Sequence, residues 1–257
     1  MPAFLYDRTF EGLLCALFDA YSRKDFPDVL LAAGDVLPLP AMRTHRVLTS
    51  RDRAIRVWKG LAGKLSPNAL HSLAYAWLGE EEGGDIRLLR CMRKVFDSRG
   101  SPETDLGDFL AVFRLARKVN REAHRLQGFA RFQKTAQGVY FAAVEPRYDL
   151  LPLLAPHFAA RFPDQQWILY DVGRRYGLFC DKGAYRDITL AAGCLRQNRL
   201  EDGLLADGEK IFQTLWKSYC QALTIQERLN PKLQSRCLPR RYWPYLTEMA
   251  ESAQISS

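Results

Sequence analysis

The sequence of 257 residues lacks the short motifs by which many enzymes and metalloproteins are recognised. It contains no GxSxG, GxxxxGK[ST], HExxH or GxGxxG pattern, and so shows none of the common catalytic or nucleotide-binding signatures. None of the six cysteines forms a CxxC pair, and the four histidines have no ligand-like spacing to one another or to a cysteine. We therefore expect buried free thiols, no metal, no iron–sulfur cluster and no other cofactor.

The sequence also lacks a segment suited to a membrane. No run of about 18 apolar residues is present, which excludes a transmembrane helix. The first 21 residues contain Asp7, Arg8, Glu11 and Asp19, and these charges do not fit a secretory signal. Since 47% of the residues are hydrophobic, we expect a globular protein. Because neither a transmembrane helix nor a secretory signal is expected, we place it in the cytoplasm.

Positive charge is present in excess, and it is concentrated. The chain has 37 Lys and Arg against 29 Asp and Glu, a formal net charge of +8. Residues 86–131 have a local net charge of +6 and residues 217–245 one of +5, so the rest of the chain is slightly acidic. Because the charge is clustered, it favours an anionic partner over a role in solubility alone.

The spacing of apolar residues predicts an α+β fold with a helical N-terminal half. Helices are expected over 10–21, 50–61, 66–78, 86–96 and 105–125, with an extended linker at Val36–Pro40. The helix at 105–125 is expected to bury Leu106, Phe109, Leu110, Phe113, Ala116 and Val119.

From Gly128 onward, the pattern becomes that of short strands. Two hairpins, 128–134 with 139–145 and 167–172 with 176–181, flank a helix at 150–162 and predict one antiparallel sheet of about four strands. A C-terminal helix over 204–229 is expected to bury Ile211, Leu215, Tyr219 and Leu223. We expect a mostly helical region 1–121, an α+β region 122–250 packed with it as one unit, and a frayed tail 251–257.

Several basic residues are placed to contact nucleic acid. On the helix at 105–125 they recur at steps of three and four on the face opposite the apolar one: Arg114, Arg117, Lys118, Arg121 and Arg125. Near the C-terminus, Arg240 and Arg241 adjoin Tyr242 and Trp243, a pairing that suits single-stranded or flipped bases. The alternative for these four is an aromatic staple that closes the core, with the arginines in water.

The segment between the predicted helix and the first strand is dense in polar side chains. Arg131, which we expect to hold a damaged or extruded base together with Arg240 to Trp243, lies between Phe129 and Phe132, which strand parity places on opposite faces. His124 and Arg125 either grip a phosphate or complement the dipole at a helix C-terminus. Carboxylates offer a different chemistry: Glu145 and Asp171 at strand ends, with His124, are candidates for a catalytic site that chelates Mg²⁺. The alternative is that these carboxylates pair with nearby arginines.

Short motifs spread from about residue 5 to 250 resemble a bacterial family of probable DNA-metabolism proteins whose activity is unknown. The motifs are Tyr6-Asp7-x-x-Phe10-Glu11-Gly12, Glu122-x-His124-Arg125-x-x-Gly128-Phe129-x-Arg131-Phe132, Glu145-Pro146-x-Tyr148-Asp149, His157-Phe158-Ala159-x-Arg161-Phe162-Pro163, Trp167-x-Leu169-Tyr170-Asp171, Leu215-Trp216-Lys217, Glu227-Arg228-x-Asn230-Pro231-x-Leu233-Gln234 and Pro239-Arg240-Arg241-Tyr242-Trp243. The chain departs from the family at Arg8 and Thr9, where members are richer in glycine or serine. The resemblance supplies no catalytic residues.

The resemblance implies a companion of a radical-SAM protein that has a helix-hairpin-helix DNA-binding region. In some bacteria a related domain is fused to a uracil-DNA-glycosylase-like domain. We expect this chain to lack that fused domain, because the motifs of the resemblance already extend over nearly all of its residues. Our leading hypothesis is a nucleic-acid-binding accessory protein in DNA repair or modification, acting on damaged or single-stranded DNA. Two alternatives remain open: a metal-dependent nuclease or base-processing hydrolase, and an interaction module that docks an acidic partner.

Overall fold

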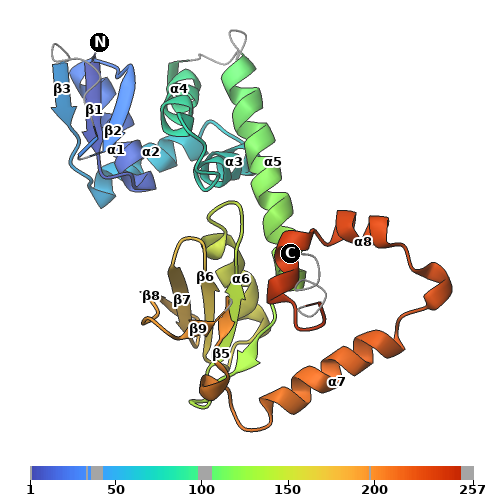
Figure 1. Cartoon of the computed structure of the whole chain (residues 1–257). Helices are drawn as coiled ribbons and strands as arrows, with labels where there is room; N and C mark the ends of the chain where they lie inside the picture. The colour runs from blue at the N-terminus through green and yellow to red at the C-terminus, as the bar shows by residue number, and fades with distance from the viewer. Residues whose placement is uncertain (1, 33, 36–42, 98–105, 197, 250–257) are drawn as a thin grey trace. The chain divides into compact units, whose positions relative to one another are not determined.

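The computed structural model describes residues 2–32, 34–35, 43–97, 106–196 and 198–249. The expected linker at Val36–Pro40 and the expected tail 251–257 lie outside these residues. Contacts divide the chain into two compact units, residues 1–121 (unit 1) and residues 122–257 (unit 2). The fold is α+β, as the sequence predicts, and each unit contains a sheet (Figure 1).

Unit 1 begins with a three-stranded parallel sheet in the order β2-β1-β3 (Figure 1). The chain runs through β1 (Pro2–Tyr6), α1 (Phe10–Arg23), β2 (Val29–Ala32) and β3 (Arg43–Arg46). Helix α1 forms the crossover between β1 and β2, and the Thr9 side chain caps it by accepting a 2.9 Å hydrogen bond from the Gly12 N–H. The sequence predicts a mostly helical region here and no strands, so this parallel sheet adds strands that were not expected.

The helices of unit 1 confirm the periodicity of the sequence. They are α2 (Arg51–Ala62), α3 (Pro67–Trp77), α4 (Gly84–Asp97) and α5 (Leu106–Phe129), whose last turns belong to unit 2. Leu13, Leu17, Leu61, Leu88 and Met92 form part of the buried core. On α5, Leu110 and Phe113 are exposed, contrary to expectation. The rest of the protein therefore covers only part of the apolar side of this helix.

Unit 2 contains a five-stranded mixed sheet in the order β4-β5-β6-β7-β8 (Figure 1). Its elements are β4 (Gln133–Lys134), β5 (Tyr140–Val144), α6 (Leu151–Arg161), β6 (Trp167–Asp171), β7 (Tyr176–Asp181) and β8 (Ala184–Ile188). Both expected hairpins are present, and Gly138 has the positive φ of +82° that its turn requires. The sheet is not wholly antiparallel, because α6 is a crossover that leaves β5 and β6 parallel.

The helix α5 continues to Phe129, which shortens the strand expected from Gly128. Phe129 is therefore the last residue of a helix, and the strand-parity argument for Phe129 and Phe132 does not apply. Phe132 instead packs edge-to-face on Phe158 of α6, with ring centroids 5.1 Å apart.

After the sheet, the chain forms short elements and one long helix. They are β9 (Leu195–Arg196), β10 (Arg199–Leu200), η1 (Asp202–Leu204), α7 (Glu209–Ala222), η2 (Gln226–Arg228), α8 (Pro231–Cys237) and η3 (Arg240–Tyr245). The expected burial of Ile211, Leu215, Tyr219 and Leu223 is wrong, because all four side chains are more than half exposed. No helix among the described residues is both long enough and apolar enough to span a membrane.

Candidate nucleic-acid interface

Four exposed cations line the part of α5 that belongs to unit 1. They are Arg114, Arg117, Lys118 and Arg121, which we call the α5 stripe. Their spacing keeps them on one side of the helix over about 10 Å, while Val112 and Val119 are buried on another side. Within the described part of the chain, none of the four makes an ion pair or a hydrogen bond through its side chain. The stripe is therefore a row of uncompensated positive charge.

The basic residues of α4 differ, because most of them are neutralised inside unit 1. Arg87 pairs with Glu81 through a short contact, Arg93 pairs with Asp97 at 3.1 Å, and Lys94 lies 3.8 Å from Asp108 of α5. Exposed pairs of this kind add little to stability, but they cancel local charge. The excess charge that the sequence locates in residues 86–131 is thus available mainly on α5.

Arg131 is held by several acceptors in unit 2. Its guanidinium donates to the Glu248 carboxylate at 2.7 and 3.2 Å and to the Gly128 carbonyl at 2.8 Å. The Trp216 indole N–H also donates to Glu248, at 2.8 Å. Burial alone would raise the pKa of Glu248, but these hydrogen bonds and the charge of Arg131 lower it overall. Arg131 thus meets its counter-ion inside the protein, whereas half-buried Arg125 has no such partner among the described residues.

The C-terminal segment expected to hold a base is packed into unit 2. Tyr242 and Trp243 are buried, and the Trp243 indole N–H donates to the Leu238 carbonyl at 3.0 Å. Arg240 lies over the Trp243 ring, with its guanidinium carbon 5.5 Å from the ring centroid. This geometry is that of the aromatic staple, with Arg240 and Arg241 at the surface.

Glu122 is the acceptor that fastens this segment. One carboxylate oxygen of the 6%-exposed side chain accepts hydrogen bonds from Arg241 at 2.7 Å, from the Tyr242 hydroxyl at 2.5 Å and from the Arg147 N–H at 3.0 Å. Burial raises the pKa of Tyr242, and the bond to Glu122 raises it further. We call this set of contacts the Glu122 hub.

The candidate catalytic residues do not form a metal site. Glu145 and Asp171 lie at neighbouring strand ends and both approach Gly173, but Asp171 is fully buried and pairs with Arg174 at 2.9 Å. Burial raises the pKa of Asp171, although the bonds from Arg174 oppose that rise. Glu145 accepts a 2.5 Å hydrogen bond from the Tyr245 hydroxyl. Among the described residues, no group of three or more His, Cys, Asp and Glu could hold a metal.

His124 instead lines a pocket between the end of α5 and α6. The pocket has a volume of about 590 Å³ and is also lined by Arg131. Gln127, His157 and Arg161 contribute polar side chains, and Phe132, Phe158 and Phe162 contribute rings. We call it the His124 pocket. Of these residues, only His124 and Arg131 are among the site residues predicted from the sequence.

A signal for these residues was present in the sequence. His157 and Arg161 are spaced i, i+4 on one predicted helix, and both belong to one motif. Spacing cannot show that this face of α6 meets the last turn of α5, where Gln127 precedes His157 by 30 residues.

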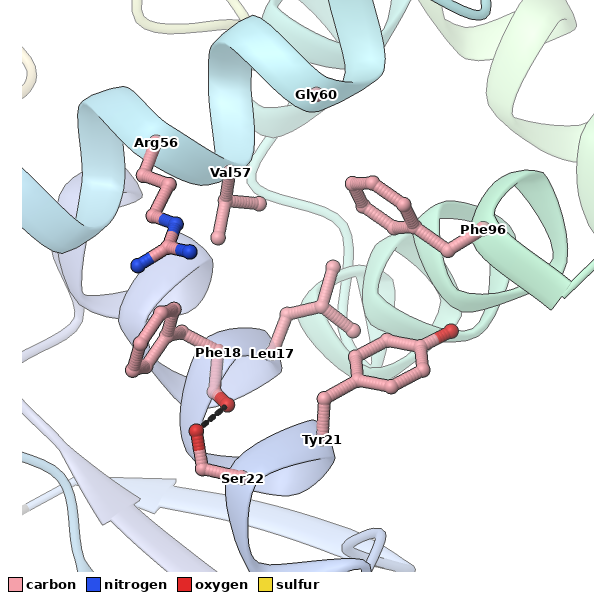
Figure 2. Close-up of a pocket in the computed structure, with 8 residues that line it drawn as sticks. All are labelled: Leu17, Phe18, Tyr21, Ser22, Arg56, Val57, Gly60 and Phe96. Carbon is pink, nitrogen blue, oxygen red and sulfur yellow. Dashed lines mark hydrogen bonds between the residues drawn. The ribbon is translucent and has the colours of Figure 1, made fainter.

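A different pocket in unit 1 is mostly apolar (Figure 2). It has a volume of about 350 Å³ and lies between side chains of α1, α2 and α4, among them Leu17, Val57 and Phe96. Arg56 lies over the Phe18 ring, 6.0 Å from its centroid, and the Tyr21 hydroxyl donates to Asp97 at 2.6 Å. Such a lining has one cation and no cluster of donors, so it does not match a phosphate.

Comparison with known proteins adds one result. A family model, DUF4130, described as a domain of unknown function, matches residues 83–248, which is more than half of the chain. No curated protein and no solved structure matches the chain.

Proposed function

The chain belongs to the DUF4130 family, whose function is unknown, and from that premise we propose that it binds nucleic acid through the phosphate backbone. The observation that supports this proposal is the α5 stripe, because its four exposed cations have no anionic partner within the described residues. On α4, by contrast, most cations are neutralised by carboxylates of unit 1. The charge of the α5 stripe is not cancelled in this way, so it remains available to an external anion.

In this proposal the α5 stripe contacts phosphates without reading sequence. Double-stranded DNA presents one charge for about every 1.7 Å of its axis, so about 10 Å of duplex carries about six phosphates, of which the four cations of the stripe can neutralise three or four. Neutralising that many phosphates releases counter-ions, and log Kd should change with log salt with a slope of about 3 to 4. Raising the salt from about 50 to 200 mM should then weaken binding about 40- to 150-fold.

The experiment is a fluorescence-anisotropy titration of a labelled DNA duplex and of a single strand with the full chain at several salt concentrations. The test variant combines Arg114→Gln, Arg117→Gln and Arg121→Gln, and it should lower the slope by about 3. A matched control combines Arg23→Gln, Arg43→Gln and Lys64→Gln, three exposed cations elsewhere in unit 1. Binding that is independent of salt, or a slope that both triple variants reduce equally, would overturn the proposal.

The resemblance of the sequence motifs supports a more specific role. On that basis we place the protein in the cytoplasm, in DNA repair or modification, acting with a radical-SAM protein and related to domains fused to a uracil-DNA-glycosylase-like domain. Co-purification of the radical-SAM companion tests this part of the proposal. Association that survives nuclease treatment would indicate direct contact, and loss of association after nuclease treatment would leave the partners joined only through DNA.

A further inference from the structure

The His124 pocket offers hydrogen-bond donors that nothing in the described structure uses. His124 and Gln127 come from the last turns of α5, and His157 and Arg161 come from α6. None of these four side chains makes a hydrogen bond or an ion pair with any described residue. No Asp or Glu lines the pocket, so it contains no carboxylate that would repel an anion. Such a set of groups suits an anion with several acceptor oxygens.

The ends of two helices would normally disfavour an anion here, because carbonyl groups point from a helix C-terminus. At the end of α5, Arg131 offsets this effect by donating to the carbonyls of Gly128 and Ala130, at 2.8 and 3.4 Å. Arg131 itself is balanced by Glu248 at 2.7 Å. Arg161 is therefore the exposed and uncompensated guanidinium of the pocket.

The wall of the pocket is aromatic. Phe132 meets Phe158 and Phe162 edge-to-face, with ring centroids 5.1 and 5.5 Å apart. Phe158 is buried, whereas Phe132 and Phe162 are half-buried and keep ring surface available. Arg161 lies near the Phe162 ring, with its guanidinium carbon 5.8 Å from the centroid. An aromatic ligand that stacks against these phenylalanines could therefore place an attached anionic group beside Arg161.

We propose that the His124 pocket binds one unstacked nucleotide of a single strand. Its phosphate would accept hydrogen bonds from Arg161, His124 and His157, and its base would lie against Phe132 and Phe162. The volume of about 590 Å³ is within the range of small-molecule sites. The inference rests on the proposed function, since it requires that the protein binds nucleic acid. The strand must be single, because a base within a duplex is already stacked and cannot enter the pocket. It adds the type of nucleic acid and the place where one base is held.

The test uses isothermal titration of the full chain with thymidine 5′-monophosphate, with thymidine and with inorganic phosphate. We expect the nucleotide to bind more tightly than either fragment, since only the nucleotide occupies both the donors and the rings. Arg161→Gln should weaken nucleotide binding about tenfold, because it removes a charge-assisted hydrogen bond. The matched control is Arg236→Gln, which alters an exposed arginine of α8 without a partner among the described residues.

A second variant separates the two parts of the pocket. Phe162→Leu should weaken binding of the nucleotide about fivefold or more and leave binding of inorganic phosphate unchanged. Its melting temperature shows whether loss of the ring also disturbs the packing on Phe132 and Phe158. The inference is wrong if the nucleotide does not bind, if it binds no better than phosphate, or if Arg161→Gln binds it like the unaltered chain.

The triple variant of the α5 stripe distinguishes a failure of the pocket proposal from a failure of the proposed function. It should lose salt-dependent binding of long DNA and retain binding of the mononucleotide. Salt-dependent DNA binding without mononucleotide binding would overturn the pocket alone. Mononucleotide binding by a chain that does not bind long DNA would overturn the phosphate-backbone proposal alone.

Discussion

The Glu122 hub allows a quantitative prediction about stability. In Glu122→Leu, one buried oxygen that accepts three hydrogen bonds is lost. The Arg241 side chain is 46% exposed and the Arg147 N–H belongs to an exposed residue, so water can replace the carboxylate for both. The Tyr242 hydroxyl still accepts a hydrogen bond from Arg241, but Tyr242 is only 1% exposed, so water cannot replace the carboxylate as the acceptor of the hydroxyl proton. Leaving that proton without an acceptor costs about 1–3 kcal/mol, so we expect unit 2 to lose about 2 kcal/mol.

The assay is native-state hydrogen exchange, with β6 reporting on unit 2 and α1 reporting on unit 1. A loss of about 2 kcal/mol should accelerate exchange of β6 about 30-fold and leave that of α1 unchanged. Adding Tyr242→Phe removes the stranded hydroxyl, so the double variant should be more stable than Glu122→Leu alone. The reasoning is refuted if the two substitutions destabilise additively, or if α1 is affected as much as β6.

Two further predictions concern pH and a glycine. Burial raises the pKa values of Tyr242 and Tyr245, and the hydrogen bonds to Glu122 and Glu145 raise them further. Both neutral tyrosines therefore stabilise the folded state at lower pH. Above about pH 10 this stability falls, by up to about 1.4 kcal/mol per pH unit for each tyrosine. Urea unfolding between about pH 9 and 11 should show this fall, and Tyr245→Phe should make it shallower. In unit 1, Gly12→Ala would place a Cβ 2.1 Å from an Asp7 oxygen and should cost about 1–3 kcal/mol. Gly128→Ala, which meets nothing within 4 Å, is the control, and equal melting temperatures for the two variants would contradict the prediction.

The sequence predicts elements with a clear period better than elements without one. Helices α1 to α4 and the strands β5 to β7 follow apolar patterns and lie where expected. The parallel sheet of unit 1 could not be found in this way, because β3 reads Arg-Thr-His-Arg and β2 is an apolar run of four residues. Each of these strands is defined by its neighbours rather than by its own residues.

The candidate site shows the same division. The pattern of charge identified the α5 stripe, because period alone places Arg114, Arg117 and Arg121 on one face. It could not identify every cation that has a partner, since Asp108 and Glu248 neutralise Lys94 and Arg131 through contacts set by the tertiary fold. For α7, period correctly gives an apolar face, but whether that face is covered depends on what surrounds the helix.

The Glu122 hub also determines when unit 2 can finish folding during synthesis. Glu122 and Tyr242 are 120 residues apart in the chain, whereas the whole sheet of unit 1 is complete by Arg46. A ribosome adds about 5–20 residues each second, so the sheet of unit 1 has all its strands many seconds before Tyr242 exists. From the time Glu122 is made until Tyr242 is made, the end of α5 carries a carboxylate that lacks its side-chain partners Arg241 and Tyr242. A nascent chain stalled before residue 242 should therefore have a protease-resistant unit 1 joined to a protease-sensitive unit 2.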